Sequence, residues 1–401
     1  MELKNKLINL LNKHFSLLIL GAASLSFFLT NIILKDYLSS ENYGLYSLFI
    51  TYISLLSSFG LLGFEQVIIR TASIFSDKII ISNKLLAPII ISALLVAVLG
   101  SFLFINNYNL LVSHTFLFFI TLLVVITKLF FNLFRLLSQF TFSQLVLNFW
   151  KFGLFIVLLI LIFSRNIIIL EDIIMIIFIF LIMSMFMVFA LYNKVQFSPI
   201  LSSNKVLRQA GLFLLSLLTI SLINFGDRFF IESRFGLQDL GDYFFFINLF
   251  LFPFTLFQSY VGFKEIVNFK LSYNQDLLAE KLKKIFKYSL IFGVFLFILS
   301  FLIDYFDVYH IKLIENSSMI ILLIVLGIVK MVYSLLSSAM GAICNNQMLF
   351  KINLYSIISI LILCPFIYYY STTITITILF LIVLWLIRCV IWYKQLLSFE
   401  N

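Results

Sequence analysis

The segment 318–342, SMIILLIVLGIVKMVYSLLSSAMGA, is apolar along almost its whole length and contains one charged residue, Lys330. An α-helix rises about 1.5 Å per residue, so a helix over this segment would cross the roughly 30 Å hydrocarbon core of a bilayer. The same pattern recurs in eleven further segments: 14–34, 43–64, 85–105, 111–134, 141–163, 170–192, 210–233, 243–263, 284–304, 349–370 and 373–393. The sequence therefore predicts an all-α, polytopic membrane protein with about 12 transmembrane helices.

The composition of the chain excludes a water-soluble protein. Hydrophobic residues make up 63% of the 401 positions, charged residues 11%, and the mean hydropathy is +1.13. A soluble globular protein contains about 25% charged residues. The connections between the predicted helices are short, which leaves no room for an extramembrane domain. The net charge of +9 would suggest a nucleic-acid partner in a soluble protein, but its distribution along this chain has another explanation.

The basic residues lie mainly in alternate connections between the predicted helices. If the N-terminus is placed in the cytoplasm, most of the 27 lysines and arginines, Arg388 among them, fall at or near the inner face. This bias is the usual signal for orientation in a membrane, so we expect both termini in the cytoplasm and no nucleic-acid partner. We also expect the basic segment 281–287 to lie against the anionic inner leaflet.

A short motif occurs twice in the chain. Residues 37–46, YLSSENYGLY, and 234–243, RFGLQDLGDY, both contain an acid-or-amide pair, one residue, Gly, one residue and Tyr. The two copies follow the first and the seventh predicted span, with six spans in each half. Because six is even, both halves enter the membrane with the same orientation, which is one of the repeat types known in transporters. The sequence predicts two six-helix lobes, 1–200 and 201–401.

Three segments carry a resemblance to a known family. They are ILKDYLSSENYGLYSLF at 33–49, NFGDRFFIESRFGLQDLGDYFFF at 224–246 and AEKLKKIFKYSLIFG at 279–293. These segments resemble the polysaccharide biosynthesis and export family, and within it the O-antigen flippases (Wzx type) of the multidrug/oligosaccharidyl-lipid/polysaccharide (MOP) superfamily. The resemblance extends over the whole chain in length and topology. The predicted number of spans fits the O-antigen group better than the larger number typical of peptidoglycan-precursor flippases.

The resemblance implies a fold, a cargo and partners. The fold would be MATE-like, with two six-helix lobes around a central cavity that opens alternately to either side of the membrane. The cargo would be an oligosaccharide repeat unit linked to undecaprenyl pyrophosphate, on its way to lipopolysaccharide. The partners would be membrane lipids and other polysaccharide-assembly proteins.

Charged residues at membrane depth are the candidate functional residues, because each costs roughly 2.5–3.5 kcal/mol to insert. Arg228 lies on one helical stripe with Ser221, Asn224 and Glu232, and Asp227 flanks that stripe. One interpretation is an Arg228–Glu232 pair that lowers the cost of insertion. The other is a guanidinium that binds an anion in the transport cavity. The two interpretations are compatible, and the sequence leaves both open.

Two lysines are further candidates. Lys330 stands near the middle of its span, and Lys151 follows Gln144 and Asn148 on one helix face. Lys151 points either into the cavity or inward along its helix. We therefore predict five substrate-binding residues: Arg228, Lys330, Lys151, Asn224 and Asn148. The hydroxyl stripe Ser47, Thr51, Ser54 and Ser58 is more typical of helix packing than of a ligand site.

Enzymatic motifs are absent from the sequence. It contains no phosphate-binding glycine loop, no zinc-binding histidine pair and no nucleophile elbow, so we expect neither an enzyme nor a bound cofactor or metal. Transport would then draw on an ion gradient or on the membrane potential. The candidate ion-coupling residues are Asp227, Glu232 and Glu65.

The resemblance implies a bacterial inner-membrane flippase for undecaprenyl-pyrophosphate-linked oligosaccharides that works by alternating access, and the mid-span cations are consistent with its pyrophosphate. A MATE-like exporter of drugs or cations is the main alternative. It is disfavoured because the mid-span cations outnumber the mid-span acids. A membrane-embedded O-antigen polymerase is a weaker alternative, because the chain lacks a large periplasmic loop.

Overall fold

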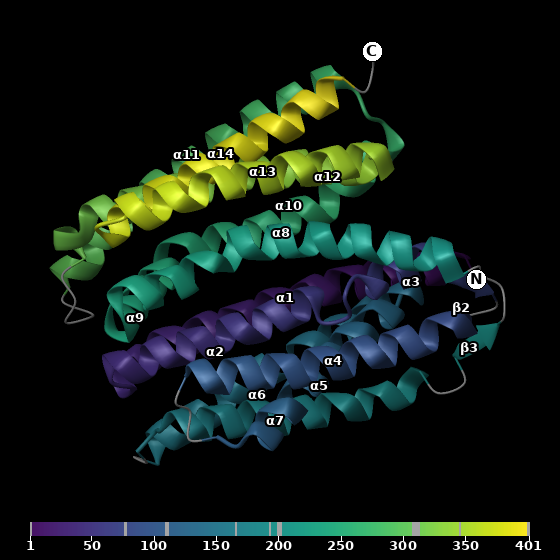
Figure 1. The fold of residues 1–401 in the computed structure, drawn as a ribbon, viewed down its shortest axis with the longest axis horizontal. Coiled ribbons are helices and arrows are strands. Elements are labelled where there is room, and N and C mark those ends of the chain that lie inside the picture. Colours follow the sequence, from purple (N-terminus) through teal and green to yellow (C-terminus); the bar gives the residue numbers. More distant parts are fainter. Residues whose placement is uncertain are drawn as a thin grey trace. The chain divides into compact units, whose positions relative to one another are not determined.

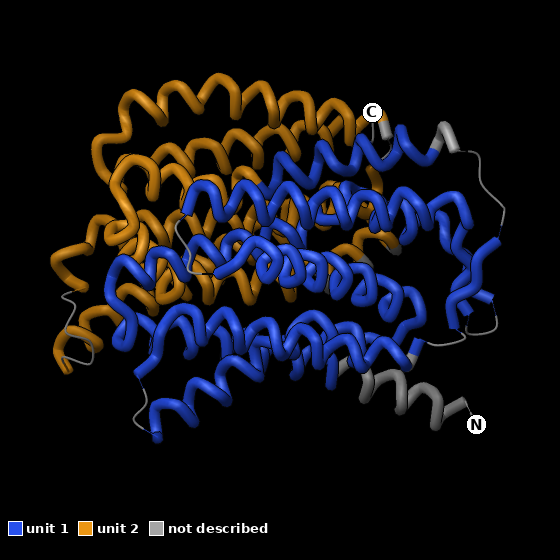
Figure 2. Tube along the Cα trace, turned by 60° about the horizontal axis from the view of Figure 1, so that its bottom comes forward, with its two compact units in different colours: residues 1–221 blue, residues 222–401 orange. Residues whose placement is uncertain are grey.

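A computed structural model of the chain describes residues 2–75, 78–108, 112–164, 167–191, 194–198, 203–306, 313–344 and 346–398. Within these ranges, 12 helices are long and apolar enough to cross a membrane. This confirms the predicted all-α, polytopic architecture with its twelve spans. The chain divides into two compact units, residues 1–221 and 222–401, shown in blue and orange in Figure 2. The boundary between the two units lies within one long helix, Ser203–Phe235. The predicted lobes 1–200 and 201–401 stay a prediction.

The first unit is a bundle of transmembrane helices with a small sheet. The most extensive contacts between its helices join α1 (Glu2–Tyr37) to α6 (Phe140–Phe163), α6 to α7 (Leu170–Phe186), and α4 (Asn83–Asn107) to α5 (His114–Leu136). Its elements in chain order are α1 (Glu2–Tyr37), α2 (Ser40–Phe59), α3 (Phe64–Thr71), β1 (Ser73–Phe75), β2 (Lys78–Ser82), α4 (Asn83–Asn107), α5 (His114–Leu136), α6 (Phe140–Phe163), α7 (Leu170–Phe186), the 3-10 helix η1 (Met187–Leu191), β3 (Val195–Ser198) and the first part of α8 (Ser203–Phe235).

The second unit is built around one central helix, α12. This helix packs against α10, α11 and α14, and 78% of its most apolar 18-residue stretch is buried. A Cβ added at Gly327 would collide with the ring of Phe254 on α10, so the glycine allows the two helices to approach closely. The elements are the remainder of α8, α9 (Leu237–Phe246), the π-helix η2 (Ile247–Leu251), α10 (Phe252–Leu271), α11 (Gln275–Tyr305), the 3-10 helix η3 (Ile314–Asn316), α12 (Ser317–Ile343), α13 (Asn346–Tyr370) and α14 (Ile374–Leu397).

The small sheet in the first unit joins two connections that are far apart in sequence (Figure 1). Strand β1 pairs antiparallel with β2, and β2 pairs in parallel with β3, in a register that sets Ile79 opposite Val195. Four spans separate β2 from β3 in the chain. An even number of crossings is required for the two strands to meet on the same side of the membrane. The sheet therefore agrees independently with the number of spans in this unit.

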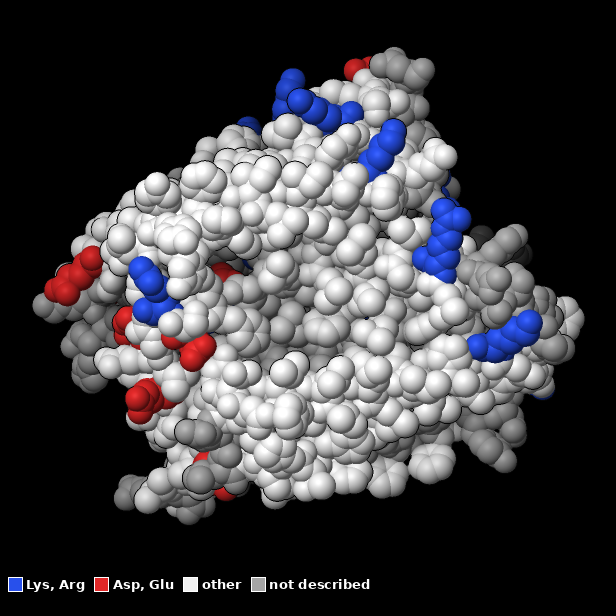
Figure 3. Space-filling model, in the orientation of Figure 1, with Lys and Arg blue, Asp and Glu red and all other residues white. Residues whose placement is uncertain are grey.

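Most charged side chains lie at the helix ends. In each unit, most of the basic side chains visible in Figure 3 gather toward one end of the helices and most acidic ones toward the other, with uncharged surface between them. The uncharged surface includes many exposed apolar side chains on lipid-length helices, such as Phe102 on α4 and Ile298 on α11. This is the distribution expected where hydrocarbon is the solvent for the middle of the helices.

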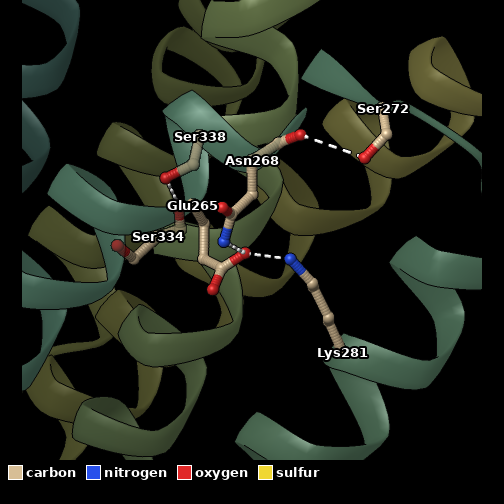
Figure 4. A network of polar contacts seen from close by, with 6 residues as sticks. All are labelled: Glu265, Asn268, Ser272, Lys281, Ser334 and Ser338. Atoms are coloured by element: carbon tan, nitrogen blue, oxygen red, sulfur yellow. Dashed lines mark hydrogen bonds and ion pairs between the residues drawn. The ribbon is translucent and has the colours of Figure 1, made fainter. Parts of the chain in front are cut away.

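The basic segment at the start of α11 is partly engaged by other side chains. Lys281 forms an ion pair with Glu265 of α10, and the Asn268 amide donates to the same carboxylate oxygen at 3.1 Å (Figure 4). Lys284 forms an ion pair with Glu280 one turn away on its own helix. Lys281 thus ties two helices together, whereas Lys283 is exposed and free to meet lipid headgroups.

Candidate functional site

In each unit, the repeated motif forms a clasp between two helices. In the first unit, the Tyr46 hydroxyl donates to Oδ1 of Asn31 at 2.8 Å, which holds α2 to α1. In the second unit, the Tyr243 hydroxyl donates to Oδ2 of Asp227 at 2.6 Å, which holds α9 to α8. The partner residues are 15 and 16 positions apart. The two clasps match in geometry and differ in charge, because Asp227 is a carboxylate where the first unit has an amide.

Asp227 is the centre of a group of charges in the second unit. Its negative charge acts on the neighbouring Arg228 of α8 and on Lys330 of α12. Its Oδ1 atom is buried and has no hydrogen-bond partner in the described chain. The structure therefore brings together three of the predicted residues, two as candidate substrate ligands and one as a candidate ion carrier.

Arg228 lies among aromatic rings. Its guanidinium carbon is 5.2 Å from the ring centroid of Phe244 and 5.5 Å from that of Phe225, within the range of cation–π attraction. An acid that acts on it is Asp227, the flanking residue, so the predicted pairing with Glu232 is not needed to explain its presence in the span. The Glu232 pairing stays a prediction. Glu232 and Asn224, on the same helix, are both half-buried.

Lys330 is buried in the most enclosed helix of the unit, with 7% of its surface exposed. Its ammonium lies 5.1 Å from the ring centroid of Trp385 on α14. The hydroxyls that follow it on α12 are used for packing: Ser334 donates to the carbonyl of Gln258 on α10 at 3.0 Å, and Ser338 donates to that of Ser334 (Figure 4). The Lys330 ammonium itself makes no hydrogen bond to the described residues.

Arg388 is a functional candidate that the sequence analysis missed. The sequence predicts that it lies at or near the inner face, and the structure adds that its side chain is buried, with 2% exposure. Its Nε donates to the Tyr333 hydroxyl at 2.9 Å, and its guanidinium lies over the rings of Tyr333 and Trp392. Its Nη1 is buried and has no hydrogen-bond partner in the described ranges. The signal was available: Trp385 and Trp392, two of the three tryptophans, lie three before and four after it on one helix face.

An apolar cavity of about 620 Å³ adjoins these charges within the second unit. It is formed by α8, α13 and α14, and the single charged residue in its lining is Asp227. Lys330, Arg228 and Arg388 do not line it. Asp227 thus lines the cavity with part of its surface, although its Oδ1 atom is itself buried, and the three cations lie outside the lining.

In the first unit, the predicted Lys151 stripe forms a hydrogen-bonded chain on α6. The Lys151 ammonium donates to Oδ1 of Asn148 at 2.8 Å, and the Asn148 amide donates to the carbonyl and the side chain of Gln144 at 3.0 and 3.1 Å. Asn148 thus uses its amide as a donor to Gln144 and its oxygen as an acceptor for Lys151, and its part in substrate binding stays a prediction. Lys151 lines a separate cavity of about 200 Å³.

Glu65 is buried at the start of α3, with 2% exposure and no hydrogen-bond partner for either carboxylate oxygen in the described chain. The positive charge of Lys128 on α5 acts on it. Of the second-span hydroxyls, Thr51, Ser54 and Ser58 each donate to the carbonyl four residues earlier, whereas the buried Ser47 hydroxyl has no hydrogen-bond partner in the described chain.

No group of three or more His, Cys, Asp and Glu side chains suited to a metal ion occurs among the residues that the structure describes. Comparison with known proteins rests on the fold. No protein-family model matches the chain, and neither does any curated protein.

Solved structures do match, over nearly the whole chain. An inward-facing multidrug resistance MATE family transporter of the MOP superfamily matches with 12% identity over 94% of each chain and a TM-score of 0.60. The outward-facing conformation of such a transporter matches with 11% identity over 96% of this chain and 94% of that one, with a TM-score of 0.57.

A third match is a MOP superfamily transporter from Pyrococcus furiosus, for which reverse polarity of the binding pocket suggests a different function. Its identity is 13% over 98% of this chain and 96% of that chain, with a TM-score of 0.56. Identities this low carry no information about substrate. They show that the chain has the fold of the MATE transporters of the MOP superfamily.

Proposed function

We propose that this membrane protein is a flippase that moves undecaprenyl-pyrophosphate-linked oligosaccharides across the bacterial inner membrane by alternating access. One observation carries the proposal: the charges held inside the helices are mainly positive. The second unit holds Arg228, Lys330 and Arg388 against Asp227 and Glu232. A pyrophosphate supplies the negative charge that such an interior requires.

The chemistry of these cations suits a pyrophosphate. Arginine offers a planar fork of donors that matches phosphate oxygens, and lysine offers a compact charge that adapts to several positions. The MOP transporter from Pyrococcus furiosus supports the idea that this fold accepts pockets of different polarity. The resemblance of 33–49, 224–246 and 279–293 to O-antigen flippases supports the choice of cargo.

A specific observation favours a second candidate, an exporter of lipophilic cations. The apolar cavity of about 620 Å³ has one carboxylate, Asp227, whose Oδ1 has no partner in the described chain. A cavity of this size, apolar with one acidic group, fits an amphipathic cation. The flippase remains the first proposal because Arg228 and Lys330 already supply positive charge to Asp227.

One experiment separates the two functions. The gene is expressed in cells that lack their own O-antigen flippase, and surface polysaccharide and susceptibility to lipophilic cations are measured in parallel. A flippase restores polysaccharide and leaves susceptibility unchanged. Restored resistance without polysaccharide supports the exporter instead. The direct assay follows a fluorescent undecaprenyl-pyrophosphate oligosaccharide across the membrane of vesicles that contain the purified protein.

The proposed setting follows from the charge distribution and the cargo. The protein would lie in the inner membrane with both termini in the cytoplasm, where the lipid-linked repeat unit is made. It would work beside other polysaccharide-assembly proteins that supply the cargo and use it after transport. Energy would come from an ion gradient or the membrane potential, with Asp227, Glu232 and Glu65 as the candidate carriers.

A further inference from the structure

The cavity beside Lys151 lies wholly within the first unit. It is lined by side chains from α1, α2, α5, α6 and α7 and has a volume of about 200 Å³. Pockets that hold drug-sized ligands have volumes of about 300–1,000 Å³. This cavity is therefore too small for a sugar pyrophosphate and suits a ligand of a few atoms.

The cavity has one charged group, the Lys151 ammonium. An ammonium has three N–H donors, and one of them is used by Asn148 at 2.8 Å. The rings of Phe27 and Trp150 lie 5.5 and 5.7 Å from the nitrogen and leave its other donors available. The remaining donors need an acceptor.

The other polar side chains of the lining add two donors, the Ser57 hydroxyl and the indole N–H of Trp150. The Ser57 hydroxyl has no hydrogen-bond partner in the described chain. The hydroxyls of Ser54 and Thr127 use their protons on backbone carbonyls at 2.7–2.9 Å. The lining donors without a hydrogen-bond partner in the described chain are therefore the remaining N–H groups of the ammonium, the Ser57 hydroxyl and the Trp150 indole N–H.

Lys151 differs from the two other lysines enclosed by the spans in having no acid nearby. Asp227 acts on Lys330, and Glu65 acts on Lys128, but no described charged group acts on Lys151. An uncompensated charge at membrane depth is costly, and a counter-ion in a polar cavity is one way to remove the cost.

We propose that this cavity binds a small monovalent anion of the chloride type, held by the Lys151 ammonium and the Ser57 hydroxyl. The anion supplies the counter-charge that Asp227 and Glu65 supply to the other two lysines. The proposal concerns an inorganic ion inside the first unit and does not depend on the identity of the transported cargo.

The test uses the purified full-length protein in detergent. Its Tm is measured in sodium chloride, sodium bromide and sodium gluconate at equal ionic strength, over a range of anion concentrations. A bound anion stabilises the folded state in a saturable way, by roughly 1–2 °C at several times its Kd for a chain of 401 residues. Gluconate is too large for the cavity and should give no such increase.

Variants locate the ion. Lys151→Gln should lose the chloride response, Lys151→Arg should keep part of it, and Ser57→Ala should require more chloride for the same increase. Lys128→Gln is the matched control, because Lys128 is also enclosed in the first unit and does not line this cavity. We expect the Tm of Lys128→Gln to be lower than that of the parent protein. The increase in Tm from gluconate to chloride should nevertheless be the same in both proteins.

Bromide soaked into crystals of the parent protein gives a direct reading, because its anomalous signal should lie within hydrogen-bonding reach of the Lys151 nitrogen. Three results would overturn the proposal: equal Tm values in chloride and gluconate, a chloride response that survives Lys151→Gln, or water alone in the cavity. The first of these is also expected if Lys151 is an uncharged amine. None depends on polysaccharide export, so failure here is distinguishable from failure of the proposed function.

Discussion

The Tyr243 hydroxyl donates a 2.6 Å hydrogen bond to the Asp227 carboxylate, and in the other unit Tyr46 makes the matching bond to the Asn31 amide at 2.8 Å. The bond in the second unit involves a charged acceptor, and such bonds contribute about 1.5–3 kcal/mol, against about 0.5–1.5 kcal/mol for a neutral pair. We expect Tyr243→Phe to lower Tm more than Tyr46→Phe does. An equal decrease in Tm for the two variants would mean that the charge of Asp227 adds nothing to its hydrogen bond with Tyr243.

Arg228 is the residue on which the cargo proposal can be tested most directly. We expect Arg228→Ala to abolish export while the protein still reaches the membrane, and Arg228→Lys to retain part of it, because the charge remains and the bidentate geometry is lost. Arg208→Ala is the matched control, an exposed arginine on the same helix. The measurements are surface polysaccharide and membrane protein level.

A structural role for Arg228 predicts a different result in double variants. If the guanidinium only compensates an acid, then Arg228→Ala combined with Asp227→Asn, or with Glu232→Ala, should recover export, because no unpaired charge remains. Recovery in either double variant would remove Arg228 from the binding site. We expect both double variants to stay inactive.

Export by Lys330 variants should depend on the charge of the side chain more than on its shape. We expect Lys330→Arg to export more than Lys330→Gln, which leaves Asp227 without one of its two neighbouring cations. Trp385→Phe keeps an aromatic face under the ammonium, whereas Trp385→Leu removes a cation–π contact of about 0.5–2 kcal/mol. Equal export from Lys330→Arg and Lys330→Gln would contradict a role in binding pyrophosphate.

Arg388 should prove dispensable for stability and necessary for transport. Replacing a buried charge by an apolar residue of similar size is often neutral or stabilising by about 1–4 kcal/mol. We therefore expect Arg388→Met to keep or raise Tm, since a buried Nη1 without a partner is removed, and to lose export. A fall in Tm with export intact would identify Arg388 as a packing residue for Tyr333 and Trp392.

The topology can be tested with reporter fusions. Fusions at Asn83 and Asn274 should report the cytoplasm, and those at Asn107 and Asn316 the periplasm. The structure adds a check within the first unit: cysteines at the paired positions Ile80 and Gln196 should react with the same membrane-impermeant reagent from the same side. A periplasmic signal at Asn274 would contradict the predicted number of spans before that residue.

Sequence reasoning succeeded where length and spacing decide the structure. The twelve apolar segments predicted as spans correspond to twelve helices long enough to cross a membrane. The side chains predicted on one face of the fifth span, Gln144, Asn148 and Lys151, are linked by hydrogen bonds. The position of Arg388 along its span does not indicate that its side chain is buried, whereas the two tryptophans on the same helix face do. Sequence reasoning missed the sheet, because strands as short as Val195–Ser198 carry no periodic pattern, and their partner lies four spans away.

The parallel pairing of β2 with β3 has a consequence for how the protein is made. Synthesis delivers β2 to its side of the membrane long before β3, which follows the sixth span. Until then β2 exposes an unpaired edge, and such an edge is prone to incorrect association. The sheet can close only when four successive spans have entered in alternating directions. A nascent chain that skips one of them leaves the two strands on opposite sides, so closure of this sheet reports a correctly threaded first half.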